Sequence, residues 1–462
     1  MISAQFKTHF RGEAPAMLRL ALPLIGAQIT FVGFGVLDTL MAGRLGGREL
    51  AAIAVGSNVW VQIFIFFMGI CVACSPIVAH RAGAGEAPAR TGLFVRQALA
   101  AAVVMGLLWI FLLRQIAWPA ISLLGLTPET ADLAYRYVLA ESWSGVLFTL
   151  CFTLRNCAEG LGLSRVVLFA GLCGLAAKAL FNVLLVHGKA GLPAFGTVGF
   201  GYATVGAAFV ILLAYLAQYA LVSQLRAFEL WRRAPLRLSG EVLELFKLGL
   251  PIGMILFAEV AFFGCTALLM ARFGDAVVAA HQVAINFASI TFMVPLGIGM
   301  AAAVRVGHAA GAGHAAEALA RGKVAMSLAL CFALFSATLM AFFPELVISF
   351  YTRVPDVAKQ AETFLRLAAI FQLFDCLQAA ANGALRGIKD TNKPMFITIV
   401  AYWGVGMPAS YVLAFTLNFG PNALWWGFVL ALAVAAISLT WRFVLRAGRG
   451  IHRPDRAAGA VV

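Results

Sequence analysis

The sequence LPLIGAQITF at residues 22–31 opens a stretch that the chain contains twice. The first copy continues with MAGRLGGRELAAIAVGSN (41–58) and ends with HRAGAG (80–85). The second copy begins with LPIGMILFAE (250–259), continues with MARFGDAVVAAHQVAIN (270–286) and ends with HAAGAG (308–313). The copies align without a gap and lie 228 residues apart, so that Pro23 pairs with Pro251 and His80 with His308. A period of about half the chain indicates a duplicated half rather than a short solenoid repeat.

The composition is that of a membrane protein. Of the 462 residues, 62% are hydrophobic and only 12% are charged, and the mean hydropathy is +0.92. Soluble domains carry about 25% charged residues. Ionised side chains are absent from residues 50–79, 190–225, 276–304, 324–344 and 394–440. Each of these stretches reaches the roughly 20 residues that a helix needs to cross the hydrocarbon of a bilayer.

We predict twelve membrane-spanning helices. They cover residues 16–40, 50–76, 93–114, 131–158, 165–187, 198–225, 242–271, 277–304, 318–343, 357–385, 394–417 and 423–446. Six spans return the chain to its starting side, so the two copies have the same orientation and form two six-helix bundles related by a pseudo-twofold axis along the membrane normal. The predicted domains of this all-α integral membrane protein are an N-lobe (1–225), a cytoplasmic linker (226–244) and a C-lobe with a short basic tail (245–462).

Positive charge sets the expected orientation. Basic residues concentrate in alternate loops, for example at Arg81, Arg155 and Arg386, and in the tail from Arg446 to Arg456. By the positive-inside rule we expect both termini to be cytoplasmic, in a multi-pass protein of the cell inner membrane. The same pattern accounts for the net charge of +14 without nucleic acid as a partner. The first apolar segment starts too late and runs too long for a cleavable signal peptide, so we expect it to remain as the first span.

The sequence lacks the motifs of soluble enzymes and metal proteins. Its eight cysteines fall in or beside predicted spans, where we expect reduced, packed thiols. No Cys/His cluster has zinc spacing, and no Walker A sequence is present, so we expect neither a cofactor nor ATP as the energy source. The Gly-Ala-Gly runs at 83–85 and 311–313 follow a span without a preceding strand, which favours a loop turn over phosphate binding.

Two acids within predicted spans are the first candidates for function. Glu259 lies in the middle of the seventh span, and Asp375 lies in the tenth on a polar face with Phe371, Gln372, Gln378 and Asn382. A charge at the centre of a spanning helix costs at least about 2.5 kcal/mol. No basic residue in the same helices is placed to neutralise this pair, which favours a functional role over a structural ion pair. Two nearby carboxylates repel when both are ionised, so one takes up a proton or both share a cation.

A third acid, Asp38, lies toward the outer end of the first span. Lys178 and Asn182 share one face of the fifth span at a spacing of one helical turn. We expect Asp38 to bind the coupling cation, with the alternative that Lys178 is its structural ion-pair partner. Asn182 fits a functional site or an ordinary interhelical hydrogen bond equally well.

Further candidates have strong structural alternatives. His281 and Gln282 begin the eighth span, where a histidine is more often a packing residue than a switch. Pro23 and Pro251 occupy matching positions near the cytoplasmic ends of the first and seventh spans. Each removes a backbone donor and could hinge its helix, but an ordinary packed kink explains them equally well.

Several blocks together resemble the multidrug and toxic compound extrusion (MATE) transporters of the bacterial NorM type, over nearly the whole chain. They are Asp38-Thr-Leu-Met-Ala-Gly-Arg-Leu-Gly46, Lys178-Ala-Leu-Phe-Asn182, Gly188-Lys-Ala-Gly-Leu-Pro193, Gly199-Phe-Gly-Tyr-Ala-Thr204, Ala280-His-Gln282, and Gln372-Leu-Phe-Asp375 leading to Gly383-Ala-Leu-Arg-Gly-Ile-Lys-Asp390. The resemblance implies two six-helix bundles that export cationic, amphipathic drugs and dyes in exchange for Na⁺ or H⁺.

The resemblance also implies roles for particular residues. Glu259 and Asp375 match the family's C-lobe cation site and would be the metal ligands if Na⁺ is the coupling ion, whereas Asp38 and Asn182 match its N-lobe acidic cluster. We expect the substrate cavity to be lined by Asp38, Lys178, Asn182, Gln282, Phe371 and Gln378. Family members often have a tyrosine where this chain has Phe371, and a phenyl ring offers Na⁺ no oxygen ligand. This departure weakens the assignment of Na⁺ as the coupling ion.

The expected mechanism is antiport. A proton or Na⁺ neutralises Glu259 and Asp375, with Asp38 as a second cation-sensitive acid, and the cationic drug is then released outward. We expect a monomer whose other contacts are membrane lipids. One alternative is a flippase or exporter of a lipid-linked precursor or anionic metabolite, which should have a cavity rich in Arg and Lys. A second alternative, from a different functional class, is an integral-membrane enzyme or receptor, which would need a catalytic cluster or a sizeable loop domain.

Overall fold

The computed structural model describes residues 4–191, 193–232 and 240–448. Within these ranges every regular element is a helix, which confirms the all-α prediction. Eleven of these helical segments are long and apolar enough to cross a membrane. The pair α5 (Pro128–Ser142) and α6 (Ser144–Gly160), bent by 46°, passes the same test as one broken span. The described residues therefore provide the twelve predicted spans, and the span predicted at 131–158 is the bent one.

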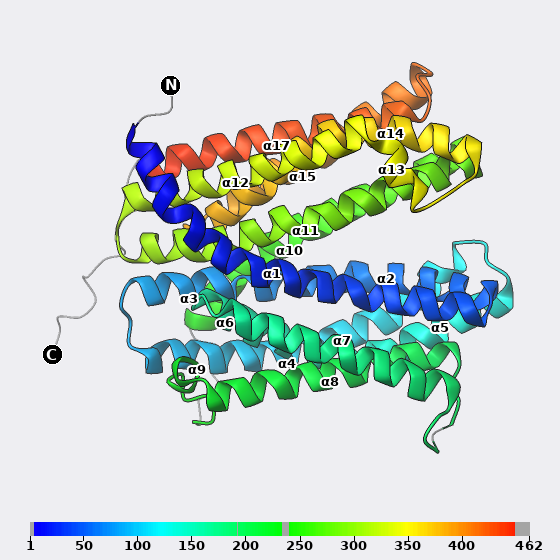
Figure 1. The fold of residues 1–462 in the computed structure, drawn as a ribbon. Helices are drawn as coiled ribbons and strands as arrows, with labels where there is room; N and C mark the ends of the chain where they lie inside the picture. Colours follow the sequence, from blue (N-terminus) through cyan, green and yellow to red (C-terminus); the bar gives the residue numbers. More distant parts are fainter. Residues whose placement is uncertain (1–3, 192, 233–239, 449–462) are drawn as a thin grey trace. The chain divides into compact units, whose positions relative to one another are not determined.

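The chain divides into two compact units (Figure 1). Unit 1 holds the residues up to Ile25, residues Pro76–Glu86, and those from Ala258 onward, whereas unit 2 holds Gly26–Ser75 and Ala87–Phe257. These bounds differ from the predicted lobes because α1 (Ala4–Leu45), α3 (Cys74–Gly83) and α10 (Gly240–Met270) each contribute to both units. The lobes, the two-bundle arrangement and its axis stay predictions, and residues 233–239 of the predicted linker lie outside the described residues.

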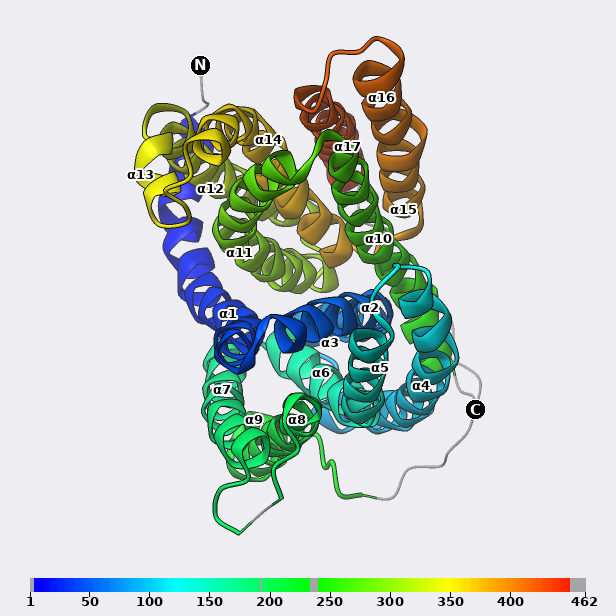
Figure 2. The ribbon, with the colours of Figure 1, turned by 90° about the vertical axis from the view of Figure 1, so that its right-hand side faces the viewer.

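Unit 2 is built from helices that pack side by side (Figure 2). Besides parts of α1 and α10, they are α2 (Gly47–Val72), α4 (Pro88–Ser122), α5, α6, α7 (Ser164–His187), α8 (Thr197–Leu221) and the short α9 (Ser223–Arg226). Aromatic rings fill the interior: the Phe64 ring stacks 4.6 Å from that of Trp60 and 5.3 Å from that of Phe31. Packing of this kind, together with interhelical hydrogen bonds, associates helices in lipid, where no hydrophobic effect draws them together.

Unit 1 contains the remaining helices (Figures 1 and 2). They are α3 (Cys74–Gly83), η1 (Ala271–Phe273), α11 (Asp275–Gly311), α12 (Ala315–Phe342), α13 (Pro344–Ser349), α14 (Pro355–Gly387), α15 (Asn392–Ile399), η2 (Val400–Gly406), α16 (Met407–Tyr411), η3 (Val412–Thr416) and α17 (Asn422–Gly448). The segments η2 and η3 are π-helical turns within the span Asn392–Thr416. Such turns are rare and often lie at functional sites.

Equivalent glycines end the first long helix of each copy. Gly46 has φ 155° and Gly274 has φ 98°, a backbone region that favours glycine because it has no Cβ atom. Each is followed at once by the next helix, α2 or α11. The duplication therefore repeats a helix break as well as a sequence.

A second pair of equivalent glycines lies inside unit 1. A methyl group at Gly83 in α3 would overlap the carbonyl oxygen of His308, and one at Gly311 in α11 would overlap that of His80. Since 80 and 83 correspond to 308 and 311 in the repeat, the two segments contact each other reciprocally. Reciprocal contact between equivalent residues is what a local twofold relation produces.

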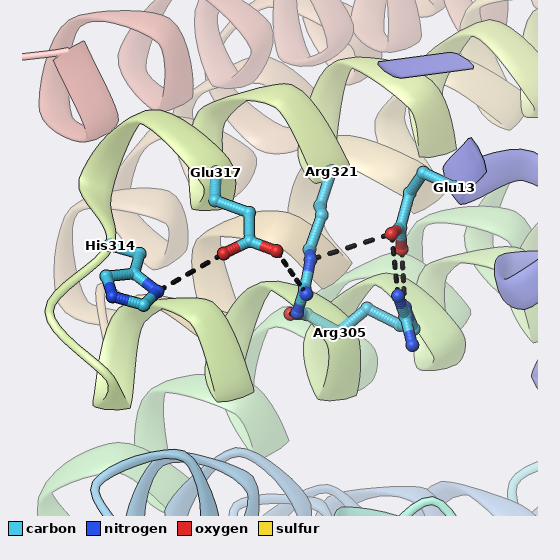
Figure 3. A network of polar contacts seen from close by, with 5 residues as sticks. All are labelled: Glu13, Arg305, His314, Glu317 and Arg321. Atoms are coloured by element: carbon cyan, nitrogen blue, oxygen red, sulfur yellow. Dashed lines mark hydrogen bonds and ion pairs between the residues drawn. The ribbon is translucent and has the colours of Figure 1, made fainter. Parts of the chain in front are cut away.

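An ion-pair network, which we call the Glu13 clasp, joins the start of α1 to α11 and α12 in unit 1 (Figure 3). The Glu13 carboxylate accepts two hydrogen bonds from Arg305, of which the one from Nη2 measures 2.6 Å, and lies 3.6 Å from Nε of Arg321. Arg321 also donates to Glu317, which lies 3.3 Å from Nδ1 of His314. The clasp ties the start of α1 to two consecutive helices from the other end of the chain, since Glu13 and Arg305 are 292 residues apart.

The eight cysteines form no disulfide, and five of them are buried. The five buried cysteines therefore pack in the protein interior as thiols.

Candidate functional site

The first candidate site, the Asp38 group, lies in unit 2. Oδ2 of Asp38 lies 2.8 Å from the ammonium of Lys178, and Oδ1 accepts a 2.8 Å hydrogen bond from the Asn182 amide. The Lys178 ammonium also donates to the Thr204 hydroxyl at 2.7 Å and to the Phe200 carbonyl at 3.0 Å. The side chains of Lys178 and Asp38 are 0% and 9% exposed. A buried ion pair is stable only when further hydrogen bonds complete it, and this one has them.

Helical spacing explains how the sequence assembles this group. Lys178 and Asn182 lie one turn apart on α7, as predicted, and Phe200 and Thr204 lie one turn apart on α8. Helices α7 and α8 pack against each other, and the C-terminal half of α1 brings Asp38 to α7. The structure thus brings together the three residues that the sequence singled out in the first half. It pairs Asp38 with Lys178, which is the structural alternative raised for that acid.

Sequence reasoning missed a second acid in the Asp38 group. Glu141 lies in the last turn of α5, next to the bend with α6, and is 5% exposed. Its carboxyl group interacts with Lys178, Tyr137, Asp38 and Thr204. Oε2 of Glu141 has no hydrogen-bond partner among the described residues. The sequence did offer a signal for Glu141, because this acid lies within the predicted span 131–158, one turn after Tyr137.

The second candidate site, the Asp375 group, lies in unit 1. Asp375 on α14 is 4% exposed, and it interacts electrostatically with the partly exposed Glu259 on α10. The structure therefore brings the two predicted acids together. Arg386, three turns after Asp375 on α14, attracts Glu259. The expectation that no basic residue on these helices is placed to neutralise the two acids is wrong for Glu259, because Arg386 on α14 attracts Glu259 on α10.

One face of α14 presents oxygens without partners. Oδ1 of Asp375 and the amide oxygens of Gln372 and Gln378 are buried and have no hydrogen-bond partner among the described residues. The three residues follow each other at a spacing of three along the helix, which places them on one face. Buried acceptors without partners carry a large desolvation cost, which a bound proton or cation would offset.

Tyr402 is a further residue that the sequence did not reveal. Its hydroxyl accepts a 2.5 Å hydrogen bond from Nε2 of Gln378, and its ring stacks 5.3 Å from that of Phe262. It also interacts electrostatically with Glu259 and Asp375. The next residue, Trp403, donates its indole N–H to the Ala258 carbonyl at 3.2 Å, which fixes η2 beside α10. Tyr402 thus brings a phenol oxygen to a group in which Phe371 offers none.

The remaining predicted cavity residues lie in different surroundings. Phe371 is 2% exposed, and its ring lies 5.9 Å from that of Phe263 and 6.0 Å from that of Trp425. His281 packs on Trp425 and Phe428, in agreement with its reading as a packing residue. Gln282 is exposed on α11, and the described contacts place it in neither group.

Neither predicted hinge proline interrupts its helix. Pro23 lies inside α1 and Pro251 inside α10, and both helices continue through them. The boundary between the two units falls at Ile25 in α1 and at Phe257 in α10. A role as hinges stays a prediction.

A small cavity lies elsewhere in unit 2. It measures about 40 Å³, and Phe31, Phe152, Arg155 and Tyr215 contribute to its lining. Drug-sized sites measure roughly 300 Å³ or more. This cavity has room for water but not for a substrate of that size.

The fold and the two groups define a multi-pass membrane protein with acids buried among its spanning helices. The chain belongs to the MatE family, whose family model matches residues 23–184 and 251–412. The second matched range is the first shifted by 228 residues, so the family match follows the internal duplication. The resemblance drawn from the sequence blocks is therefore confirmed.

Similar proteins match over nearly their whole length. The chain is 37% identical to the multidrug resistance protein PmpM of Pseudomonas aeruginosa, with 97% of this chain and 94% of that protein covered. It is 36% identical to the multidrug resistance protein MdtK of Pectobacterium atrosepticum, with 93% and 95% covered. The crystal structure of the eukaryotic MATE transporter AtDTX14 superposes with a TM-score of 0.84 at 19% identity, covering 96% of this chain and 98% of that chain. This last likeness shows a shared fold.

Proposed function

We propose that the protein is a secondary antiporter that exports cationic, amphipathic drugs in exchange for H⁺ or Na⁺. The observation that carries the proposal is the set of buried oxygens without partners at Gln372, Asp375 and Gln378, beside Glu259. Spanning helices retain such groups where ions or protons pass. Its membership in the MatE family and its relatives named multidrug resistance proteins support the same conclusion.

The Asp375 group acts as the coupling site. Binding of a proton or a cation there removes one negative charge from the pair of Asp375 and Glu259 and weakens the attraction that holds a cationic substrate. The substrate then leaves on the side from which the ion came. An ion shifts the transport equilibrium only by its difference in affinity between the states, and an acid pair supplies that difference because its charge changes on binding.

Glu141 is the acid of the Asp38 group that responds to cations. Lys178 offsets the charge of Asp38 directly, whereas the Glu141 carboxylate has an oxygen without a partner. Asp38 then holds Lys178 and Asn182 in place, and Glu141 is the group in unit 2 that a proton neutralises. This assignment replaces Asp38 as the second cation-sensitive acid.

The oxygens of the Asp375 group suit either ion. A hard cation such as Na⁺ takes oxygen ligands, which the carboxylates, the amide oxygens and the Tyr402 hydroxyl could supply. Tyr402 therefore restores part of the oxygen set that Phe371 lacks. No group of three or more acidic, histidine or cysteine ligands occurs among the described residues.

The protein acts as a monomer in the cell inner membrane, in contact with lipids and with both termini in the cytoplasm. The distribution of basic loop residues supports this orientation.

Conformational exchange uses Pro23 and Pro251, because each lies within two turns of the point where its helix passes from one unit to the other. The family assignment and the absence of zinc or Walker A sequence patterns favour transport over catalysis.

Ethidium efflux from proteoliposomes tests the proposal. A pH gradient and a Na⁺ gradient are imposed separately on the purified protein, and we expect at least one of them to drive efflux. Asp375→Asn should abolish it, whereas Asp356→Asn, an exposed acid in the first turn of the same helix, should not. Gradient-driven efflux at the unmodified rate in Asp375→Asn would refute the role of this acid, and absence of efflux under either gradient in the unmodified protein would refute the function.

A further inference from the structure

A groove of about 410 Å³ lies on unit 1, beside α15 and α17, outside both candidate sites. Its apolar lining comes from Ile397 on α15 and from Ile437, Trp441 and Leu445 on α17. The three α17 residues follow each other at intervals of one turn and form a continuous stripe. Ile437 is 60% exposed and Trp441 67% exposed, so the stripe faces away from the packed interior.

A basic stripe runs beside the apolar one. Ser438, Arg442 and Arg446 line the same groove at the same spacing. Nη2 of Arg442 donates to Oδ1 of Asp390 at 3.0 Å and lies 2.7 Å from Oδ2, whereas Nε of Arg446 lies 3.6 Å from Oδ2 and Arg446 stays 62% exposed. Two guanidinium groups thus face one carboxylate. The charges of Arg442, Arg446 and Asp390 together leave one excess positive charge in the groove. Nε of the partly buried Arg442 has no hydrogen-bond partner among the described residues.

The basic and the apolar residues of the groove lie at different positions along α17. Arg446 lies in the last turn of α17, at the basic end that the positive-inside rule places in the cytoplasm. Ile437 lies more than two turns further into the span Asn422–Gly448. Lys393, exposed and one turn before Ile397 on the same face of α15, adds positive charge at the same end. Trp441 lies between the charged end and the apolar end, where indole rings favour the membrane interface.

We propose that this groove binds one anionic phospholipid of the cytoplasmic leaflet. Its phosphate lies on the exposed guanidinium of Arg446, with Lys393 nearby. One acyl chain follows the stripe formed by Ile437, Trp441 and Leu445. A free inorganic phosphate would satisfy the arginines but would leave the apolar stripe uncovered, so the groove fits a lipid better. Basic pockets between spanning helices on the cytoplasmic side bind anionic headgroups in this way. The site is separate from the acid groups, and the proposal does not rest on the proposed function.

Quenching of Trp441 fluorescence by brominated lipids tests the proposal. The full-length protein is placed in vesicles with increasing fractions of phosphatidylglycerol or phosphatidylcholine that carries bromine on its acyl chains. The protein has nine tryptophans, so the Trp441 signal is taken as the difference between the unmodified protein and Trp441→Phe. We expect this signal to be half-quenched at a clearly lower fraction of phosphatidylglycerol than of phosphatidylcholine.

Removal of the exposed arginine supplies the decisive comparison. Arg446→Gln should lower the preference for phosphatidylglycerol roughly fivefold, since one basic residue near an anionic surface contributes about 1 kcal/mol. Arg446→Lys should keep most of the preference. Arg353→Gln, which removes another exposed charge, in the loop before α14, should leave it unchanged. Equal quenching by the two lipids, or the same preference in Arg446→Gln and Arg353→Gln, would overturn the proposal. Loss of the preference on addition of millimolar inorganic phosphate alone would assign the site to free phosphate instead.

Discussion

The Lys178 ammonium lies 2.8 Å from Asp38 in a part of unit 2 that water barely reaches, and the two charges offset each other. Two further hydrogen bonds, to Thr204 and to the Phe200 carbonyl, use the remaining donors of the ammonium. A change at either end of this pair therefore disturbs two helices, α7 and α8, as well as the charge balance.

The ion pair between Lys178 and Asp38 predicts how the stability of single and double variants should compare. Lys178→Met leaves Asp38 buried without a counter-charge, so we expect a loss of about 3–5 kcal/mol in the free energy of unfolding. Thermal and denaturant unfolding of the detergent-solubilised protein measures it. The double variant Lys178→Met/Asp38→Asn should recover most of the loss, whereas Lys189→Met, at an exposed position just after α7, should change little. A double variant no more stable than Lys178→Met alone would contradict the paired arrangement.

Glu141 should matter for transport more than for stability. Glu141→Gln keeps the shape of the side chain but removes the charge that a proton would neutralise. We expect gradient-driven dye efflux to fall roughly tenfold, within the range of coupling energies between ion and substrate sites. The matched control is Glu129→Gln, an exposed acid in the first turn of the same helix. Equal efflux by the two variants would show that the acid of α5 takes no part in coupling.

Tyr402 should distinguish the two coupling ions. Tyr402→Phe removes the hydroxyl oxygen near Glu259 and Asp375 and leaves the Gln378 amide without its acceptor, a cost of about 1–3 kcal/mol. If the group binds Na⁺, efflux driven by a Na⁺ gradient should fall more than efflux driven by a pH gradient. Proteoliposome assays with each gradient measure both rates for one preparation. A larger loss under the pH gradient would count against Tyr402 as a Na⁺ ligand.

The Glu13 clasp should hold the first turns of α1 in place. Glu13→Gln weakens contacts with two partly buried arginines, so we expect a loss of about 1–3 kcal/mol and faster amide exchange at the start of α1. Glu317→Gln removes a more exposed acid from the same network and should cost less, because solvent screens its charge. Hydrogen exchange with mass spectrometry resolves the α1 segment. Unchanged exchange there in Glu13→Gln would show that the clasp does not secure the helix.

The apolar segments and the duplication could be predicted from the sequence, because length and hydropathy determine where a chain crosses a bilayer. The shared face of Lys178 and Asn182 also followed from helical spacing. Glu141, Tyr402 and the attraction of Arg386 for Glu259 were missed for a common reason. Each acts on groups in other helices, and periodicity within one helix does not say which neighbour it faces.

The departures from regular α-helix could not be predicted from the sequence either. Tyr402 reaches Gln378 from a π-helical turn, and Glu141 lies beside the 46° bend between α5 and α6. The segment at 394–417 reads as a uniform apolar run, and no proline marks the bend between α5 and α6. Glu259 and Asp375 were visible as costly residues in apolar surroundings, but Arg386 and Tyr402, which interact with them, were not.

The reciprocal contact of Gly83 with His308 and of Gly311 with His80 has a consequence for the history of the chain. The two copies, His80-Arg-Ala-Gly83 at the end of α3 and His308-Ala-Ala-Gly311 at the end of α11, each leave room for only a hydrogen atom at the glycine of the other. After a gene duplication, neither helix end could therefore drift alone: a side chain gained by one would need a backbone shift in its counterpart. At this point the two ancestral halves have to vary together or stay as they are.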